Sequence, residues 1–188
     1  MRHRRVRFEF PGHAHELTFS CFHNQPFLLH EGWCRVLADA VNRAREKYDF
    51  NLWAYVFMPD HVHLMICPQQ SGCSIANILQ TIKQSSSRRV LNFCRREASY
   101  ELTRFETGQT ARPYRFWQDG GGYDRNIIKP ETLIAAIEYI HANPVRKGLV
   151  QTPAEWYWSS CADWSGLVRG PVGVDRETLE IMCSPKRV

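Results

Sequence analysis

The chain has 188 residues, which is enough for one domain with a substantial core. Hydrophobic residues make up 44% of the sequence and aromatic residues 12%, which argues against a disordered chain. The net charge is +5, from 24 Lys and Arg against 19 Asp and Glu, and it favours an anionic partner.

No apolar run approaches the roughly 20 residues that span a bilayer. The N-terminal "MRHRRVRFEF" lacks the apolar stretch of a secretory signal. The seven cysteines contain no CxxC pair, so we expect a cytoplasmic protein with reduced thiols and no membrane segment.

The first part of the chain alternates between strand and helix patterns. Residues 15–23 mix β-branched and aromatic side chains and predict a first strand. Residues 33–50 carry apolar side chains at helical spacing with charged residues opposite, and predict a helix. Residues 51–58 are apolar on both alternations, which is typical of a central strand covered on both faces. A Pro-Asp turn follows, so residues 61–67 should return as the antiparallel partner of that strand.

Two further helices are predicted beyond this hairpin. Ser74 is a plausible N-cap for a long helix that runs to about Arg96. After a turn-rich stretch with short strand-like pieces at its ends, residues 130–143 begin with proline and should form a helix that ends at Pro144.

This order of elements, β-α-β-β-α followed by mixed elements, predicts an α+β fold with a central antiparallel sheet and helices packed on it. No repeat or low-complexity linker divides the chain. We expect one domain over residues 1–165 and a C-terminal tail over residues 166–188.

Two histidines interrupt an otherwise apolar strand in "YVFMPDHVHLMICP", residues 55–68. His61 and His63 are two residues apart, so on a strand they project from the same face and can reach one divalent cation. The spacing alone is weak, because eight histidines in a chain of this length produce such a pair by chance roughly a third of the time. His13 and His15 form a second pair, which we interpret as structural or supporting residues. A metal site and two merely tolerated histidines both remain open from spacing alone.

The helix predicted at 130–143 carries a tyrosine and an asparagine four residues apart. Tyr139 and Asn143 are therefore neighbours on one helical face. The apolar stripe that should pack on the sheet consists of Leu133, Ile137 and Ile140. The pair lies beside that stripe, where side chains can face a groove, but spacing alone favours a packing tyrosine and a helix-end asparagine. His141 should point away from Asn143.

Three segments together resemble one protein family. "MPDHVHLMICP" resembles the His-hydrophobe-His motif of the single-tyrosine HUH transposases. "YIHANPVRKGLV" and "EWYWSS" are similar to segments of the REP-associated tyrosine transposases, which are relatives of the insertion-sequence transposases. The resemblance runs from about Gly12 to Trp164 and implies a ferredoxin- or RRM-like HUH fold. The segment 98–115 is longer than the corresponding segment of compact relatives, and no role is assigned to it.

The resemblance also implies a site and an activity. Tyr139 would be the nucleophile, and His61, His63 and Asn143 would hold one divalent ion, Mg²⁺ or Mn²⁺. The implied enzyme nicks and rejoins single-stranded DNA at palindromic repeat hairpins through a 5′-phosphotyrosine intermediate. Many mobile relatives carry Gln in place of Asn143. Tyr123 is a rival nucleophile, because "FWQDGGGYDRNI" also matches the family, but no metal ligand follows it one turn later.

Basic residues predict a side of the molecule that faces DNA. Arginine and lysine neutralise phosphates, and an aromatic ring can stack on unpaired bases. The candidates are Lys83, Arg88, Arg89, Arg112, Arg115, Trp117, Arg125, Arg146 and Lys147. The basic stretch "RRVRF" near the N-terminus could reach a groove or the end of a duplex. For any single cation in this group a solvated surface charge is the favoured explanation, so the prediction concerns the group.

Two other functions remain open beside the transesterase. One is a non-catalytic module of the same fold that binds a nucleic-acid hairpin. The other is a hydrolytic metal nuclease that uses His61 and His63 without a covalent step. Asp60 is the only acid adjacent to the histidine pair, which favours transesterification over hydrolysis. The partner is expected to be single-stranded or hairpin DNA, and a monomer is favoured over a homodimer.

Overall fold

The computed structural model describes residues 12–167 and 170–183. At its centre is a four-stranded antiparallel sheet in the order β2-β3-β1-β4. Its strands are β1 (Ala14–Ser20), β2 (Phe50–Phe57), β3 (His61–Pro68) and β4 (Tyr123–Ile127). Since β3 lies between β1 and β2, the helix that joins those two strands crosses over the sheet. This is the βαββαβ topology of a ferredoxin-like fold, so the expected α+β class is confirmed.

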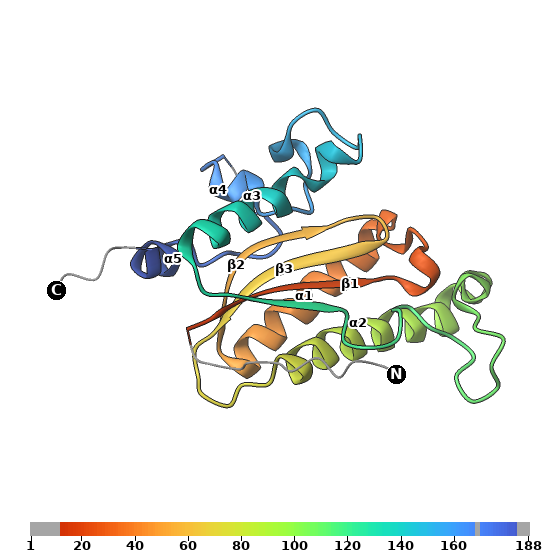
Figure 1. Ribbon diagram of the computed structural model, residues 1–188. Helices are drawn as coiled ribbons and strands as arrows, with labels where there is room; N and C mark the ends of the chain where they lie inside the picture. The colour runs from red at the N-terminus through yellow and green to blue at the C-terminus, as the bar shows by residue number, and fades with distance from the viewer. Residues whose placement is uncertain (1–11, 168–169, 184–188) are drawn as a thin grey trace, which may run out of the picture.

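Helices cover both faces of the sheet (Figure 1). α1 (Glu31–Tyr48) and α2 (Ile75–Glu97) lie side by side on one face, and α3 (Pro130–Arg146) packs on the other. Two shorter helices are α4 (Cys161–Trp164) and α5 (Arg176–Cys183), and the 3₁₀ helices are η1 (Phe22–Asn24), η2 (Phe27–Leu29), η3 (Ser99–Phe105) and η4 (Pro153–Glu155). None of the helices within residues 12–167 and 170–183 is both long and apolar enough to cross a membrane.

The strands have a core on each side because apolar residues occupy both of their alternations. Leu17 and Leu64 belong to the core beneath α1 and α2, whereas Ala14 and Met65 belong to the core beneath α3. On the α3 side this apolar core stops short of one end of the sheet. There β1 and β3 present polar side chains instead, among them Thr18 and His63. The polar end of this face is where a site can form.

The predicted elements are confirmed, with differences at their ends. The helix predicted over residues 33–50 ends at Tyr48, and Phe50 already begins β2. The first strand stops at Ser20 rather than at residue 23, because the chain turns into η1, where His23 and Asn24 have positive φ. The last long helix was expected to end at Pro144, and that was wrong, because it continues to Arg146.

Asn143 explains how the helix passes its proline. A proline within a helix leaves the carbonyl oxygen four residues earlier without its usual N–H donor, which here is the oxygen of Ile140. The side-chain amide of Asn143 donates to the carbonyl oxygen of Tyr139 at 2.8 Å and lies 3.5 Å from that of Ile140. This local hydrogen bonding lets the turn survive, and it also fixes the orientation of Asn143.

Residues 170–183, which we expected within a tail, pack against the edge strand β2. The Asp175 carboxylate accepts a hydrogen bond from the Leu52 amide at 2.8 Å and forms an ion pair with Arg45. The Asp175 amide in turn donates to the Leu52 carbonyl at 2.9 Å. Val172 and Leu179 are buried in the two cores. The segment therefore belongs to the same folded unit and covers part of an edge that would otherwise be exposed.

Residues 98–115 form a folded excursion after α2. η3 buries Phe105 completely among the aromatic residues of the α1–α2 side. The Arg115 amide donates to the Phe105 carbonyl at 2.8 Å, and Glu106 and Tyr114 form an isolated antiparallel β-bridge. The excursion thus returns the chain toward the sheet, alongside α2.

Candidate active site

The two histidines of β3 occupy the polar end of the α3 face. Their alternation on the strand puts His61 and His63 on the same side, with ring centroids 5.0 Å apart. His63 is 7% exposed, and the His61 side chain is 16% exposed. The spacing of two residues therefore produces the convergence that a strand predicts.

Each of these imidazoles is held through its Nδ1 atom. His61 Nδ1 lies 2.6 Å from Asp60 Oδ1, and His63 Nδ1 lies 2.9 Å from Thr18 Oγ1. A partner on Nδ1 fixes the ring orientation and leaves Nε2 for another ligand, an arrangement that usually accompanies histidines bound to metals. Burial, with a smaller effect of His61, lowers the pKa of His63 to about 4. The neutral ring, which is the form that binds a cation, therefore dominates at neutral pH.

Tyr139 reaches the histidine pair from α3. Its ring is edge-on to the ring of His63, with centroids 6.0 Å apart and an interplanar angle of 84°. The side chain is 42% exposed, although the neighbouring Ile140 and Ile137 are buried against the sheet. The Arg146 guanidinium lies 5.0 Å from the Tyr139 ring centroid. A solvent-accessible phenol is thus held between an imidazole and a cation.

Asn143 follows Tyr139 by one turn and is 5% exposed. Because its Nδ2 atom donates to the Tyr139 carbonyl, Oδ1 is the atom left to face another group. His141 lies elsewhere, as expected, since its Nε2 atom is 2.8 Å from Ser160 Oγ in the core.

These side chains suit a single hard cation only if oxygen ligands complete the set. Among the described residues, no group of three or more His, Cys, Asp or Glu side chains could hold a metal ion. The candidate donors are the Nε2 atoms of the two imidazoles, whose ring centroids are 5.0 Å apart, and the amide oxygen of Asn143 one turn after Tyr139, with further oxygens supplied by substrate or water. Such a mixture of nitrogen and oxygen ligands suits Mn²⁺, whereas Mg²⁺ prefers oxygen ligands and would depend more on those from substrate or water.

Tyr123, the rival nucleophile, lies on β4 in the same cross-strand row as His63. It pairs with Thr18, and Thr18 pairs with His63, so two strand spacings separate Tyr123 from His63, or about 10 Å between Cα atoms. Gly122 makes this pairing possible, because it has a positive φ and a Cβ there would overlap the carbonyl oxygen of Thr18. Tyr139 approaches His63 directly, whereas Tyr123 lies across β1 from it.

A small pocket opens between β4 and α3, and we call it the tyrosine pocket. Its volume is about 370 Å³, and its walls include both Tyr123 and Tyr139. Glu16 and Arg125 are opposite each other on β1 and β4, and Arg125 Nη1 lies 3.5 Å from Glu16 Oε2. Glu16 was not among the residues predicted from sequence. The available signal was a glutamate two residues before Thr18 on an apolar strand, hence on the same face.

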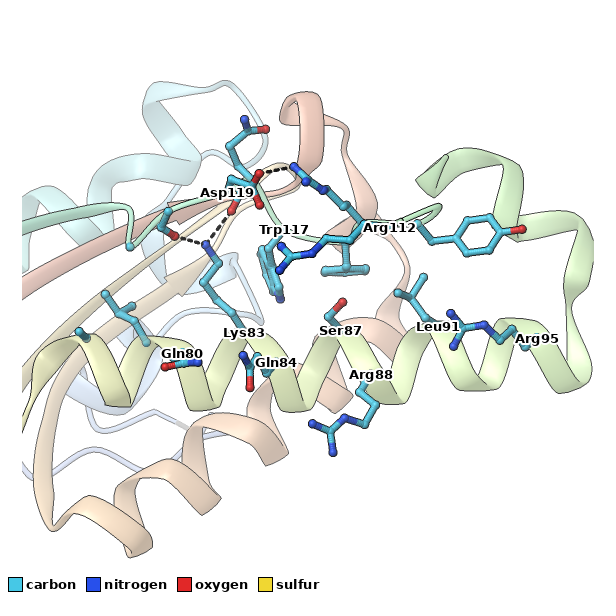
Figure 2. A pocket seen from close by; sticks show the side chains of 18 residues that line it. Gln80, Lys83, Gln84, Ser87, Arg88, Leu91, Arg95, Arg112, Trp117 and Asp119 are labelled. Carbon is cyan, nitrogen blue, oxygen red and sulfur yellow. Dashed lines mark hydrogen bonds and ion pairs between the residues drawn. The ribbon is translucent and has the colours of Figure 1, made fainter. Parts of the chain in front are cut away.

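A larger pocket lies on the other side of the sheet, between α2 and residues 112–121 (Figure 2). We call it the α2 pocket, and its volume is about 660 Å³. Of the predicted DNA-binding residues, its lining contains Lys83, Arg88, Arg112, Arg115 and Trp117. Basic residues of α2 and of the segment after residue 111, more than 20 residues apart in the sequence, thus form one concave and positively charged surface.

Two members of this group have structural partners. Lys83 reaches across the pocket, where its Nζ donates to the carbonyl oxygens of Gln118 at 2.7 Å and Gly120 at 2.6 Å (Figure 2). Trp117 is 5% exposed, and its indole N–H donates to Ser86 Oγ at 2.9 Å. The indole therefore forms part of the pocket wall and is not a free platform on which a base could stack.

The other predicted DNA-binding residues lie outside the α2 pocket. Arg89 faces α1, where its Nη2 lies 3.0 Å from Asp39 Oδ2. Arg125 lines the tyrosine pocket, Arg146 lies beside the Tyr139 ring, and Lys147 follows it as the C-cap of α3. The basic residues thus divide between two faces of the sheet. The "RRVRF" stretch lies outside the described residues.

The two histidines near the N-terminus, His13 and His15, make side-chain hydrogen bonds to residues of β4. His15 is 1% exposed, and its Nδ1 lies 2.9 Å from Asp124 Oδ1. His13 Nδ1 is 3.2 Å from Asn126 Nδ2. The first contact joins β1 to β4 and the second joins the residue before β1 to β4, which agrees with the structural role expected for these residues.

Comparisons with known proteins agree with this geometry. The family described as "Transposase IS200 like" matches residues 15–143. A curated protein of Haemophilus influenzae, named as a candidate REP-associated tyrosine transposase, is 27% identical in an alignment of 132 residues that covers 66% of this chain and 70% of that protein. A solved structure of a REP-associated tyrosine transposase bound to a REP hairpin superposes with a TM-score of 0.68 at 18% identity, covering 92% of each chain. At that identity the structural likeness concerns the fold.

Proposed function

The chain belongs to the IS200-like transposase family, and on this premise we propose that it nicks and rejoins single-stranded DNA at palindromic repeat hairpins. The observation that carries the proposal is the position of Tyr139, whose half-exposed ring lies edge-on to the ring of His63, with centroids 6.0 Å apart and His61 beside them. The similarity to a REP-associated tyrosine transposase and the basic α2 pocket support hairpin DNA as the substrate.

Tyr139 would carry the covalent step. Its phenol oxygen attacks the phosphorus of a phosphodiester, and the bond from phosphorus to the 3′-oxygen breaks. The phenol loses its proton, and the departing 3′-oxygen gains one, so the products are a 5′-phosphotyrosine and a free 3′-hydroxyl. One phosphodiester replaces another, and the reverse reaction can therefore rejoin strands without ATP.

His61, His63 and Asn143 would hold the divalent ion, Mg²⁺ or Mn²⁺. When bound, the ion supplies Lewis-acid polarisation of the phosphoryl oxygens and orients the phosphate. Asp60 and Thr18 keep the two imidazoles in the orientation that exposes Nε2. Arg146, whose guanidinium lies against the Tyr139 ring, would add positive charge next to the attacked phosphate.

The α2 pocket would hold the hairpin, away from the chemistry. Arg88 and Arg112 are exposed cations at its lining, and cations of this kind bind phosphates in a salt-dependent way. Lys83 would act mainly by bracing the 118–120 loop, since its ammonium is already hydrogen-bonded to two carbonyls.

The test is covalent adduct formation on a hairpin-bearing single-stranded oligonucleotide with Mg²⁺ or Mn²⁺. Wild-type protein should give a denaturant-resistant protein–DNA band, and Tyr139→Phe should give none. Tyr123→Phe is the matched control, because it removes the hydroxyl of the other tyrosine in the same pocket, and it should keep the adduct.

Three other results would replace the proposal. An adduct lost in Tyr123→Phe and retained in Tyr139→Phe would exchange the nucleophile. Cleavage without any adduct would indicate hydrolysis by an activated water. Tight hairpin binding with no cleavage under either ion would indicate a non-catalytic binding module.

A further inference from the structure

The tyrosine pocket is adjacent to the proposed nucleophile, and the proposed chemistry leaves most of it unused. Besides its two tyrosines it is lined by Glu16, Arg125, Thr132 and two alanines of α3. Its volume of about 370 Å³ falls in the range of small-ligand sites. Tyr139 is part of the pocket wall, so a DNA strand whose phosphate lies at Tyr139 has its flanking nucleotides close to this opening.

Glu16 is an unusual residue for the floor of such a pocket. It is 6% exposed, and desolvation raises the pKa of its carboxyl group although Arg125 opposes this effect. Among the described residues its one ion pair is the 3.5 Å contact with Arg125. A buried carboxylate with a single distant ion-pair partner costs folding free energy. The residue opposite Glu16 on β3 is Met65, which fills the same face of the sheet with an apolar side chain at no such cost. Such a cost is expected where the carboxylate serves a ligand.

The polar atoms of the pocket form a defined pattern. The Glu16 carboxylate offers two hydrogen-bond acceptors, and the Arg125 guanidinium beside it offers donors. Tyr123 forms a wall and is 45% exposed, so its ring can stack on a planar group. Ala135 and Ala136 keep the opposite wall shallow.

We infer that the tyrosine pocket binds the base of a nucleotide next to the scissile phosphate and that Glu16 and Arg125 make it prefer guanine. The Watson–Crick edge of guanine presents two adjacent donors, N1–H and the N2 amino group, next to the O6 acceptor. Two carboxylate acceptors beside a guanidinium complement that edge. Adenine and cytosine each present one amino donor there, and thymine presents one N–H between two carbonyls, so each leaves a polar atom of the pair unmatched. The inference rests on the proposed function for its account of which nucleotide arrives.

A binding measurement tests base preference without catalysis. Purified full-length protein is titrated without metal with dGMP, dAMP, dCMP and dTMP, and dissociation constants are taken from NMR shift changes. We expect dGMP to bind about tenfold more tightly than the others, since one bidentate side-chain contact supplies discrimination of that order. Glu16→Gln should abolish the preference, because its amide offers one acceptor and donors that clash with guanine.

Two further variants keep the measurement interpretable. Glu138→Gln removes the same charge from an exposed position on α3 outside the pocket lining, and it should keep the dGMP preference. Arg125→Gln changes a half-exposed residue and should weaken the preference even if Glu16→Gln fails to fold. Equal or undetectable binding of the four nucleotides, or a guanine preference that survives in both pocket variants, overturns the inference.

A second experiment places the base within the reaction. An oligonucleotide carries a hairpin followed by a random tract, and both the DNA attached to the protein and the released fragment are sequenced. Guanine should be enriched at one position beside the nick in the wild type and in Glu138→Gln, but not in Glu16→Gln. A dGMP preference without any adduct would refute the proposed reaction and leave the pocket assignment standing. An adduct without guanine enrichment would support the proposed reaction and refute the pocket assignment.

Discussion

The Thr18→Val substitution isolates how the protein holds His63 ready for a cation. Thr18 is on β1, opposite His63 on β3, and its hydroxyl lies 2.9 Å from His63 Nδ1. Valine keeps the shape and the β-branch of threonine, so the strand pairing and the packing of the row should persist. The change removes one hydrogen bond from an imidazole that is 7% exposed.

The size of the effect follows from that burial. A buried polar group that loses its partner costs about 1–3 kcal/mol, and about 1.4 kcal/mol corresponds to a factor of ten in an equilibrium constant. His63 can relieve the loss by rotating or by changing tautomer, but a bound cation forbids both. The cost therefore falls on metal binding, and we expect Mn²⁺ affinity to drop about tenfold, at the lower end of the range for such supporting residues.

The assay is Mn²⁺ binding measured by electron paramagnetic resonance of the free ion, without DNA. Thr81→Val is the matched control, because Thr81 Oγ1 makes a hydrogen bond of the same length, 2.9 Å, to the Tyr48 hydroxyl on the α1–α2 side. Both variants should lose a similar small amount of thermal stability, and Thr18→Val alone should lose Mn²⁺ affinity. Unchanged affinity in Thr18→Val, or an equal loss in Thr81→Val, would refute the assignment of His63 as a ligand oriented by Thr18.

Two further predictions concern stability and DNA. Burial lowers the pKa of His141 to about 4, so between about pH 6.5 and pH 4 the unfolded chain takes up a proton that the folded chain does not, and stability present above pH 6.5 is lost as the pH falls. Chemical denaturation at both ends of that window should show His141→Gln losing less than the wild type, by on the order of 3 kcal/mol; an identical loss would contradict the assignment. In the α2 pocket, Arg112→Gln should weaken hairpin binding and reduce the slope of log affinity against log salt by about one. Arg43→Gln, an exposed arginine on α1, should change neither quantity, and a smaller slope for Arg43→Gln alone would place the DNA elsewhere.

Local periodicity predicted the elements and the residues that share a face at the site, whereas the roles of nucleophile and metal ligand came from the resemblance to the transposase family. His61 and His63 share a face because a strand alternates every second residue, and Tyr139 and Asn143 share a face because a helix turns in about four. These relations need no knowledge of the rest of the chain. The helix end at Pro144 was missed, because the compensating amide of Asn143 is a local hydrogen bond that residue propensities do not include.

What the sequence alone determined, then, is the set of elements and the pairs within each of them. The tertiary structure decided which elements meet. Glu16, Arg125 and Tyr139 come from β1, β4 and α3, and only the pairing of β1 with β4 and the packing of α3 bring them to one pocket. Strand pairing and helix packing also separated the basic residues, since Arg89 pairs with α1 while Arg112 lines the α2 pocket. Contacts between residues far apart in the chain depend on strand register and helix packing, which periodicity within one segment does not contain.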